Sequence, residues 1–225
     1  MTDCRTLAIR CGIAAPNVVL AGIVLSTFVA TPETFTWRTR ALSDMGRATA
    51  RTFWLFNGGL ILGGLLGTPF VALLWTRARN RLERIGIALT GVAVLGMVGV
   101  GIFFLGHTAY YLESSLHGLA ALTVFGVAPV AQLLAGTGQV LAGDRWVAVA
   151  SIWLGVVHLV GWLGWLLVRS TAPDPRHWFA VPEFVAAVAF GAWILILGKR
   201  LLLGRGLEAG PEDGSKTATD WRRTG

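Results

Sequence analysis

The sequence predicts an all-α membrane protein, a bundle of about six transmembrane helices, and two properties of its composition support this. Of its 225 residues, 54% are hydrophobic and only 14% are charged, whereas a soluble domain carries about a quarter charged residues. The charged residues are also clustered, and the apolar runs between them approach the roughly 20 residues that a helix needs to cross about 30 Å of hydrocarbon. A water-soluble fold of this size could not bury so much apolar surface.

Six apolar segments are long enough to cross a bilayer. Backbone amides in lipid need hydrogen-bond partners inside the same segment, so each segment is expected to be a helix. The predicted spans are 11–30, 54–75, 86–105, 115–138, 146–168 and 179–203. Together they form a single transmembrane domain over residues 1–203. Residues 204–225 are hydrophilic and rich in Gly, Lys, Asp, Glu and Arg, which predicts a disordered cytoplasmic tail.

The distribution of basic residues predicts which ends of the spans face the cytoplasm. The N-terminal segment, the second and fourth loops and the C-terminal region carry 13 Lys and Arg residues, while the first, third and fifth loops carry 6. Loops retained in the cytoplasm are enriched in Lys and Arg, so both termini of this multi-pass cell-membrane protein are predicted to be cytoplasmic. The arginines flank spans and form no continuous patch, so the net charge of +7 does not indicate nucleic-acid binding.

Glycines recur on one face of the second span. Gly59, Gly63 and Gly67 are each four residues apart, and a helix face without side chains lets another backbone approach closely. This face is predicted to be a packing centre. Its partner is either a helix of the same chain, which we favour because five other helices need partners, or a second copy in a homo-oligomer.

Several polar residues are predicted to lie at the outer ends of the helices. They are Ser43, Asp44, Asn57, His107, Glu113, His117 and Glu183. Three of them, Asn57, His117 and Glu183, lie only about 3 to 6 Å inside the outer boundary at 1.5 Å per residue. The group could share one shallow, outward-opening pocket, and ionisable groups at membrane depth are costly to bury, which makes this outer polar cluster a site hypothesis.

A structural role is the alternative for the same residues. Ser43 and Asp44 could cap a short interfacial helix, since both residue types accept hydrogen bonds from exposed backbone amides. His117 and Asn57 could bind neighbouring helices as neutral groups.

The sequence predicts neither a metal nor another cofactor. Its four histidines include no pair at i, i+4 spacing and no His-Glu-x-x-His motif. A haem between helices would need two histidines at similar depth, but His158 lies near the predicted midplane and His117 near the outer edge. Cys4 and Cys11 match no metal-ligand or haem-attachment spacing and are expected to be free thiols. No catalytic residue is assigned.

Three short motifs resemble a known family. Residues 41–46 read Ala-Leu-Ser-Asp-Met-Gly, residues 55–60 read Leu-Phe-Asn-Gly-Gly-Leu, and residues 117–121 read His-Gly-Leu-Ala-Ala. Their order resembles the prokaryotic membrane family called domain of unknown function 998, from about the first loop through the fourth helix. The resemblance implies a six-helix membrane protein without an assigned activity. Phe103-Phe104 stands where the family often has Phe-Pro.

These observations lead to one preferred function and two alternatives. We expect a non-enzymatic membrane component that binds lipid or another membrane protein through its outer polar groups. The first alternative is a membrane-embedded hydrolase acting on a lipid or headgroup at the outer leaflet, with the same cluster as its site. A small transporter ranks third, because no internal repeat is evident and His158 is the one ionisable residue predicted near the midplane.

The orientation can be tested by labelling. Single cysteines placed within residues 31–53 and within the C-terminal tail are treated with a membrane-impermeant thiol reagent in intact cells. We expect labelling in the first loop and none in the tail, because 13 of the 19 basic residues lie on the predicted cytoplasmic side. Labelling of the tail but not of the loop would reverse the orientation.

Overall fold

The computed structural model describes residues 3–106, 113–172, 174 and 177–208, and six of its helical segments are long and apolar enough to cross a membrane. They are Cys4–Val29, Phe53–Arg77, Arg81–Ile102, Leu116–Leu141, Arg145–Thr171 and Ala180–Gly204. Each overlaps one of the segments predicted from the sequence. The all-α class and the number of spans are thus confirmed for the described part of the chain.

Five of the spans are single helices, and the fourth is composite. The single helices are α1 (Cys4–Val29), α2 (Phe53–Arg77), α3 (Arg81–Ile102), α6 (Arg145–Thr171) and α7 (Ala180–Glu208). The fourth span joins α4 (Glu113–Leu122), the π-helical turn η2 (Thr123–Val127) and α5 (Ala128–Leu141). A short 3-10 helix, η1 (Leu42–Gly46), lies in the link between α1 and α2. Residues 204–208, predicted as the start of the tail, continue α7.

Helix starts and interruptions have local causes. Asp3 caps α1 by accepting a hydrogen bond from the Arg5 amide at 3.1 Å, as polar side chains commonly do at helix N-termini. In the fourth span, Pro129 lies at the start of α5 and has no N–H to donate to the carbonyl of Phe125. The π-helical turn η2 directly precedes it and keeps the span helical across this interruption.

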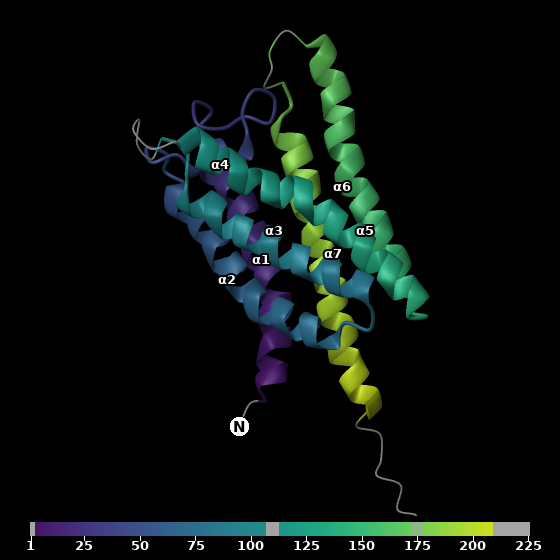
Figure 1. Cartoon of the computed structure of the whole chain (residues 1–225). Helices are drawn as coiled ribbons and strands as arrows, with labels where there is room; N and C mark the ends of the chain where they lie inside the picture. The colour runs from purple at the N-terminus through teal and green to yellow at the C-terminus, as the bar shows by residue number, and fades with distance from the viewer. Residues whose placement is uncertain (1–2, 107–112, 173, 175–176, 209–225) are drawn as a thin grey trace, which may run out of the picture.

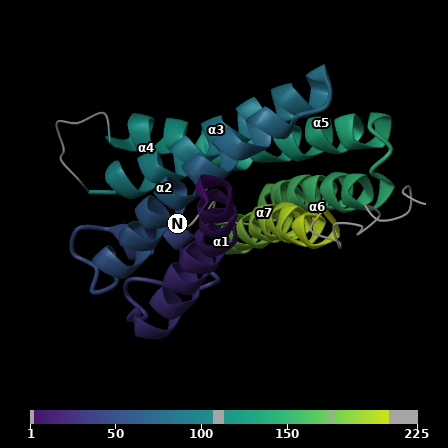
Figure 2. The ribbon, with the colours of Figure 1, turned by 90° about the horizontal axis from the view of Figure 1, so that it is seen from below.

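The six spans form a closed ring. Each span packs against the spans before and after it in sequence, and α7 returns to pack against α1. Figure 2, seen along the bundle, shows α3 and α5 on one side and α1, α7 and α6 on the other. α1 begins and α7 ends at the same end, which we call the terminal end (Figure 1). The opposite end carries η1 and the α6–α7 link, and we call it the η1 end.

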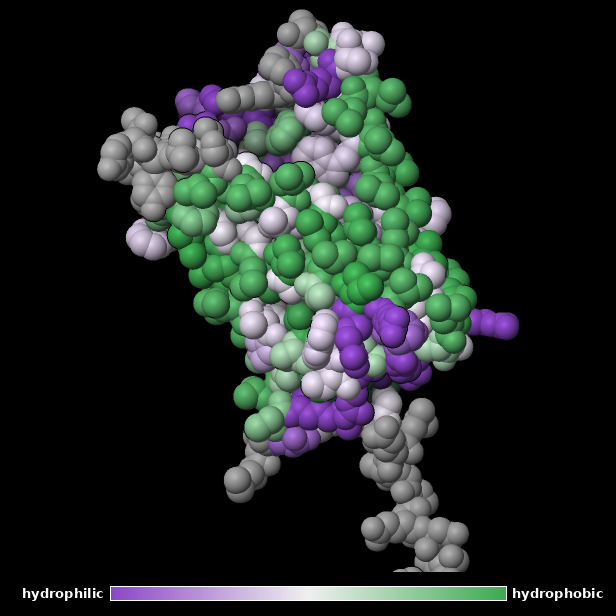
Figure 3. All heavy atoms as spheres, viewed as in Figure 1, coloured by the Kyte–Doolittle hydropathy of each residue, from purple (hydrophilic) through white to green (hydrophobic). Residues whose placement is uncertain are grey.

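The outside of the ring is apolar over its middle, as a surface in contact with lipid must be. Figure 3 shows hydrophobic residues covering the visible face between two hydrophilic zones at the ends. Large exposed side chains within the candidate spans include Leu62, Leu95, Leu119 and Val160. Such an exposed apolar band is incompatible with a monomer in water and matches the hydrocarbon layer of a bilayer.

Glycines bring the backbones of α1 and α2 together. A Cβ atom added to Gly59 would lie 3.2 Å from the Cα of Gly22 in α1. Gly63 also faces α1, whereas a Cβ on Gly67 would lie 3.1 Å from Val94 of α3. α1 therefore covers the first two glycines within the chain, and a homo-oligomer contact through them would have to displace it.

The glycine face can be tested by adding volume. In the Gly63→Leu variant the new side chain would overlap Val19 and come within 3.0 Å of the Ala15 carbonyl. We expect a lower thermal midpoint in detergent, equivalent to about 1–3 kcal/mol of overpacking. The control is Gly58→Leu in the same helix, where nothing lies within 4 Å of an added Cβ. An equal midpoint in the two variants would contradict tight α1–α2 packing at Gly63.

Candidate functional site

The Asp44 carboxylate organises η1. One of its oxygens accepts a hydrogen bond from the Ala41 amide at 3.0 Å, and the other accepts one from Nε of Arg47 at 2.7 Å. The Asp44 side chain is 2% exposed and that of Arg47 is 39% exposed. Both donors bind the charged form, so the carboxylate is paired despite its burial.

Two side chains near the start of α2 fix η1 on that helix. Thr52 Oγ1 donates to the Met45 carbonyl at 2.7 Å, and Asn57 Nδ2 donates to the Gly46 carbonyl at 2.8 Å. Glycine at residue 46 leaves room for this contact, because a Cβ there would lie 2.5 Å from the Asn57 Oδ1 and displace it. The glycine of the Leu-Ser-Asp-Met-Gly motif and the asparagine of the Phe-Asn-Gly-Gly motif are therefore direct partners.

Glu183 ties α7 to η1. Its Oε2 accepts a hydrogen bond from the Leu42 amide at 2.6 Å, and the residue is 5% exposed. The Asp44 carboxylate interacts electrostatically with it. Two acidic side chains, one from η1 and one from α7, therefore lie close together, each with a backbone amide as donor.

His117 of α4 completes this end. Its Nδ1 lies 2.8 Å from the Phe103 carbonyl oxygen, and the ring interacts electrostatically with Asp44 and Arg47. A carbonyl can only accept, so Nδ1 carries the proton in this contact. Nε2 of the neutral ring is then left as an acceptor.

Five of the seven residues predicted for the outer polar cluster therefore meet around η1. They are Ser43, Asp44, Asn57, His117 and Glu183. His107 and the side chain of Glu113 lie outside the described residues. Among the described residues, no group of three or more His, Cys, Asp or Glu could hold a metal ion.

A long cavity adjoins this cluster inside the ring. It lies between η1, α1, α2, α3, α7 and the α4–η2 segment, and holds about 960 Å³ of space not filled by protein atoms, part of it open to the outside. Its polar lining residues are Ser43, His117 and Glu183, and the others are apolar or glycine. The lining follows α7 from Glu183 to Ile194, a rise of about 16 Å at 1.5 Å per residue. The cavity is thus an elongated apolar channel with a polar end.

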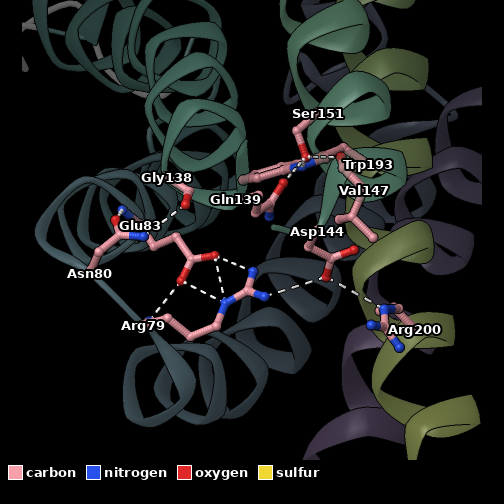
Figure 4. Close-up of polar contacts among 10 residues, drawn as sticks. All are labelled: Arg79, Asn80, Glu83, Gly138, Gln139, Asp144, Val147, Ser151, Trp193 and Arg200. Atoms are coloured by element: carbon pink, nitrogen blue, oxygen red, sulfur yellow. Dashed lines mark hydrogen bonds and ion pairs between the residues drawn. The ribbon is translucent and has the colours of Figure 1, made fainter. Parts of the chain in front are cut away.

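A second charged group lies at the terminal end (Figure 4). The Arg79 amide donates to Glu83 at 2.7 Å and its guanidinium binds the same carboxylate. Nη1 of Arg79 lies 3.6 Å from an oxygen of Asp144, and Nε of Arg200 lies 3.5 Å from that same oxygen. This network joins the start of α3, the α5–α6 link and α7.

The sequence carries a signal for this network that is separate from the predicted outer polar cluster. Asn80 and Glu83 have the spacing of a helix capping box. Asn80 accepts from the Glu83 amide at 3.0 Å, but the Glu83 carboxylate binds the amide of Arg79, one residue before the cap. The Asn80 amide group also donates to the Gly138 carbonyl at 2.7 Å, which joins α3 to α5.

Further buried polar groups lie along α6. Trp193 Nε1 of α7 donates to Ser151 Oγ at 2.8 Å, and Ser151 Oγ lies 2.7 Å from Gln139 Oε1 of α5 (Figure 4). Ser151 also approaches the Val147 carbonyl at 2.8 Å, so its single proton serves two acceptors. His158 is fully buried, and neither of its ring nitrogens makes a hydrogen bond with a described residue.

The helical ring, the internal apolar cavity and the paired polar groups at both ends define a multi-pass membrane protein. The chain belongs to the family described as protein of unknown function (DUF998), whose family model matches residues 13–200. The resemblance carried by the sequence motifs is confirmed by this match.

One curated relative has a much longer chain than this protein. The protein is similar to NADH-quinone oxidoreductase subunit N 1 of Symbiobacterium thermophilum, with 30% identity over 151 residues. The match covers 67% of this chain and 28% of the relative, so the chain spans less than a third of that relative's length. No solved structure matches the chain.

The role of Asp44 in holding η1 can be tested by truncation. Asp44→Ala removes the buried acceptor for the Ala41 amide and for Arg47. We expect a lower thermal midpoint, equivalent to about 1–3 kcal/mol, because a buried donor loses its partner. Ser43→Ala is the neighbouring control, since the Ser43 hydroxyl makes no hydrogen bond with a described residue, and it should retain the wild-type midpoint. An Asp44→Ala protein as stable as the wild type would show that this carboxylate does not hold η1.

Proposed function

We propose that this protein is a non-enzymatic membrane component that binds a lipid-like molecule, with the molecule's apolar chain in the cavity and its polar head beside Ser43, His117 and Glu183. The single observation that carries this proposal is the shape and lining of the cavity: about 16 Å of apolar wall along α7 that ends in three polar side chains. Ligand cavities typically combine a mainly apolar lining with a few polar groups that fix orientation.

The polar end favours a headgroup that donates hydrogen bonds. The Glu183 side chain and the Nε2 of a neutral His117 both offer an acceptor atom, and the Ser43 hydroxyl offers a donor and an acceptor. Hydroxyl or amine groups on a headgroup would suit this set. Apolar chains gain about 0.8 kcal/mol per CH₂ removed from water, but no such gain exists for a chain already in lipid, so the polar end must supply the selectivity.

The similarity to the NADH-quinone oxidoreductase subunit supports including a membrane quinone among the molecules to be tested. A quinone with a long apolar tail has the same division into polar head and apolar chain, and in its reduced quinol form the head carries hydroxyls that can donate to Glu183 and His117. Because the match covers 28% of that relative, we infer the chemical class of ligand from it and no redox activity.

A hydrolase acting on a lipid headgroup is the second proposal, and the observation favouring it is that Ser43, His117 and Glu183 line the same cavity. Nucleophilic catalysis by Ser43 would need a hydrogen bond to a base. The described contacts include none between Ser43 and His117, and His117 instead binds the Phe103 carbonyl. Ser43→Ala would abolish turnover of an added lipid in the hydrolase, whereas the wild-type binding protein would show no turnover to lose and Ser43→Ala would only weaken retention of the lipid.

We also propose that the protein lies in the cell membrane with both termini in the cytoplasm. The excess of basic residues at the terminal end supports this orientation. It would place the polar end of the cavity in the outer leaflet.

The proposed binding is tested by filling the cavity from two walls. Ala187 of α7 and Ala121 of α4 line it, whereas Ala88 of α3 is exposed on the outside of the ring. We expect Ala187→Phe and Ala121→Phe each to lower the co-purified lipid or quinone by about tenfold, because a benzyl group occupies the space of the bound chain. Ala88→Phe should retain the wild-type amount.

The measurement is mass spectrometry of molecules extracted from protein purified in mild detergent. Thermal midpoints of all three variants show whether the fold is kept. Wild-type ligand content in both cavity variants would overturn the proposal.

A further inference from the structure

A second cavity opens at the terminal end, and its lining is of a different character. It holds about 970 Å³ of space not filled by protein atoms, including space open to the outside. Its polar lining comes from five helices and from two of the links between them: Arg5, Arg77, Arg79, Glu83, Gln139, Asp144 and Arg200. None of these residues belongs to the outer polar cluster.

The charges in this cavity do not cancel. Four arginines line it, against the two carboxylates of Glu83 and Asp144. Both carboxylates already bind Arg79, and Asp144 also lies 3.5 Å from Arg200. Arg77, the last residue of α2, has no acidic partner within 4.0 Å among the described residues. The cavity therefore has an excess of two positive charges, with at least one guanidinium unpaired.

The acidic residues hold two of the arginines in place. Hydrogen bonds that the Arg79 guanidinium donates to the Glu83 carboxylate raise its pKa above the ordinary value, against a smaller lowering by partial burial. The guanidinium stays charged, and the bonds to Glu83 and Asp144 restrict its position. Arginines oriented in this way lose less side-chain entropy when they bind a further anion.

The deeper part of the cavity is apolar. Leu74, Ile87, Val147 and Leu197 line it beside Trp193. Arg77 ends one candidate span, and Arg200 lies near the end of another. The arginines are therefore at the depth of lipid headgroups, with apolar wall continuing toward the bilayer centre.

From this arrangement we propose that the terminal-end cavity binds the phosphate headgroup of an anionic membrane lipid. The planar guanidinium matches two phosphate oxygens at once, and basic pockets between transmembrane helices suit anionic lipid headgroups. The apolar floor would contact the first part of the acyl chains. This site is independent of the proposed cavity ligand at the η1 end, and either can fail without the other.

The test uses the full chain purified in a neutral detergent with phosphatidylcholine. Phosphatidylglycerol is titrated in, and the rise in thermal midpoint gives the half-saturation concentration. We expect phosphatidylglycerol to stabilise the protein and an equal addition of phosphatidylcholine to leave the midpoint unchanged. Arg77→Gln and Arg200→Gln should each raise the half-saturation concentration about tenfold through loss of a charge-assisted hydrogen bond.

The matched control is Arg145→Gln, which removes the same charge at the same end of the bundle but lies outside the cavity lining. It should bind phosphatidylglycerol as the wild type does. Each variant is compared with its own midpoint in phosphatidylcholine, so a change in basal stability does not enter the result. Arg77→Lys, which keeps the charge but not the planar fork, should bind more weakly than the wild type and more strongly than Arg77→Gln.

A titration with inorganic phosphate in place of lipid shows whether the site binds the phosphate of a lipid headgroup or free phosphate. Phosphate at millimolar concentration should have little effect if a lipid is the ligand, because the acyl chains are missing. Stabilisation by phosphate equal to that by phosphatidylglycerol would overturn the lipid assignment. Equal weakening in Arg145→Gln and the two cavity variants, or an equal response to phosphatidylcholine, would overturn the site itself.

Discussion

Polar groups at membrane depth have to be paired inside the chain, because hydrocarbon offers no hydrogen-bond partner, and this constraint shapes both ends of the ring. At the η1 end, Glu183 lies within a candidate span and finds its donor in the amide of Leu42, far away in sequence. That bond needs the first link to fold back over the bundle, and Asp44 and Asn57 supply the contacts that hold it there. At the terminal end, Glu83 is the buried acidic residue, and its carboxylate accepts a hydrogen bond from the amide of Arg79, just before α3 begins.

The cavity at the η1 end follows from how the ring is closed. Spans contact mainly their neighbours in sequence, so the centre must be filled by side chains directed inward. α1 and α2 approach closely through Gly22 and Gly59, so their backbones pack together on that side of the ring with no side chains between them. On α7, which packs against α1, small residues such as Ala187 and Gly191 line the cavity and fill little of it. Space is therefore left where larger side chains would have closed it, in contrast to the dense packing of most protein interiors.

Hydropathy alone predicted the six spans, because a helix that must cross lipid needs a long apolar run whatever its neighbours are. The outer polar cluster could also be predicted, because the depth of a residue in the membrane follows from its position along the helix. This placed Asn57, His117 and Glu183 at a similar depth. The fold of the first link was harder: η1 depends on the Leu42–Glu183 bond between residues 141 apart in sequence. The terminal-end network could be predicted only in part, from the capping-box spacing of Asn80 and Glu83, because Glu83 binds the amide of Arg79 rather than that of the cap residue. Neither cavity could be predicted, because a void depends on the volumes of side chains from five or six helices at once.

His158 shows that the pairing constraint is not met everywhere among the described residues. Its ring is fully buried, and the nearby Phe125 carbonyl falls short of a hydrogen bond with it. That carbonyl belongs to η2, where Pro129 provides no N–H to satisfy it. The histidine thus lies beside the stretch of the fourth span where α-helical geometry gives way to a π-helical turn. A buried polar group left unpaired costs about 1–3 kcal/mol. The same turn supplies Phe125 and Val124 to the wall of the apolar cavity, so the neighbour of this unpaired ring is also a cavity residue.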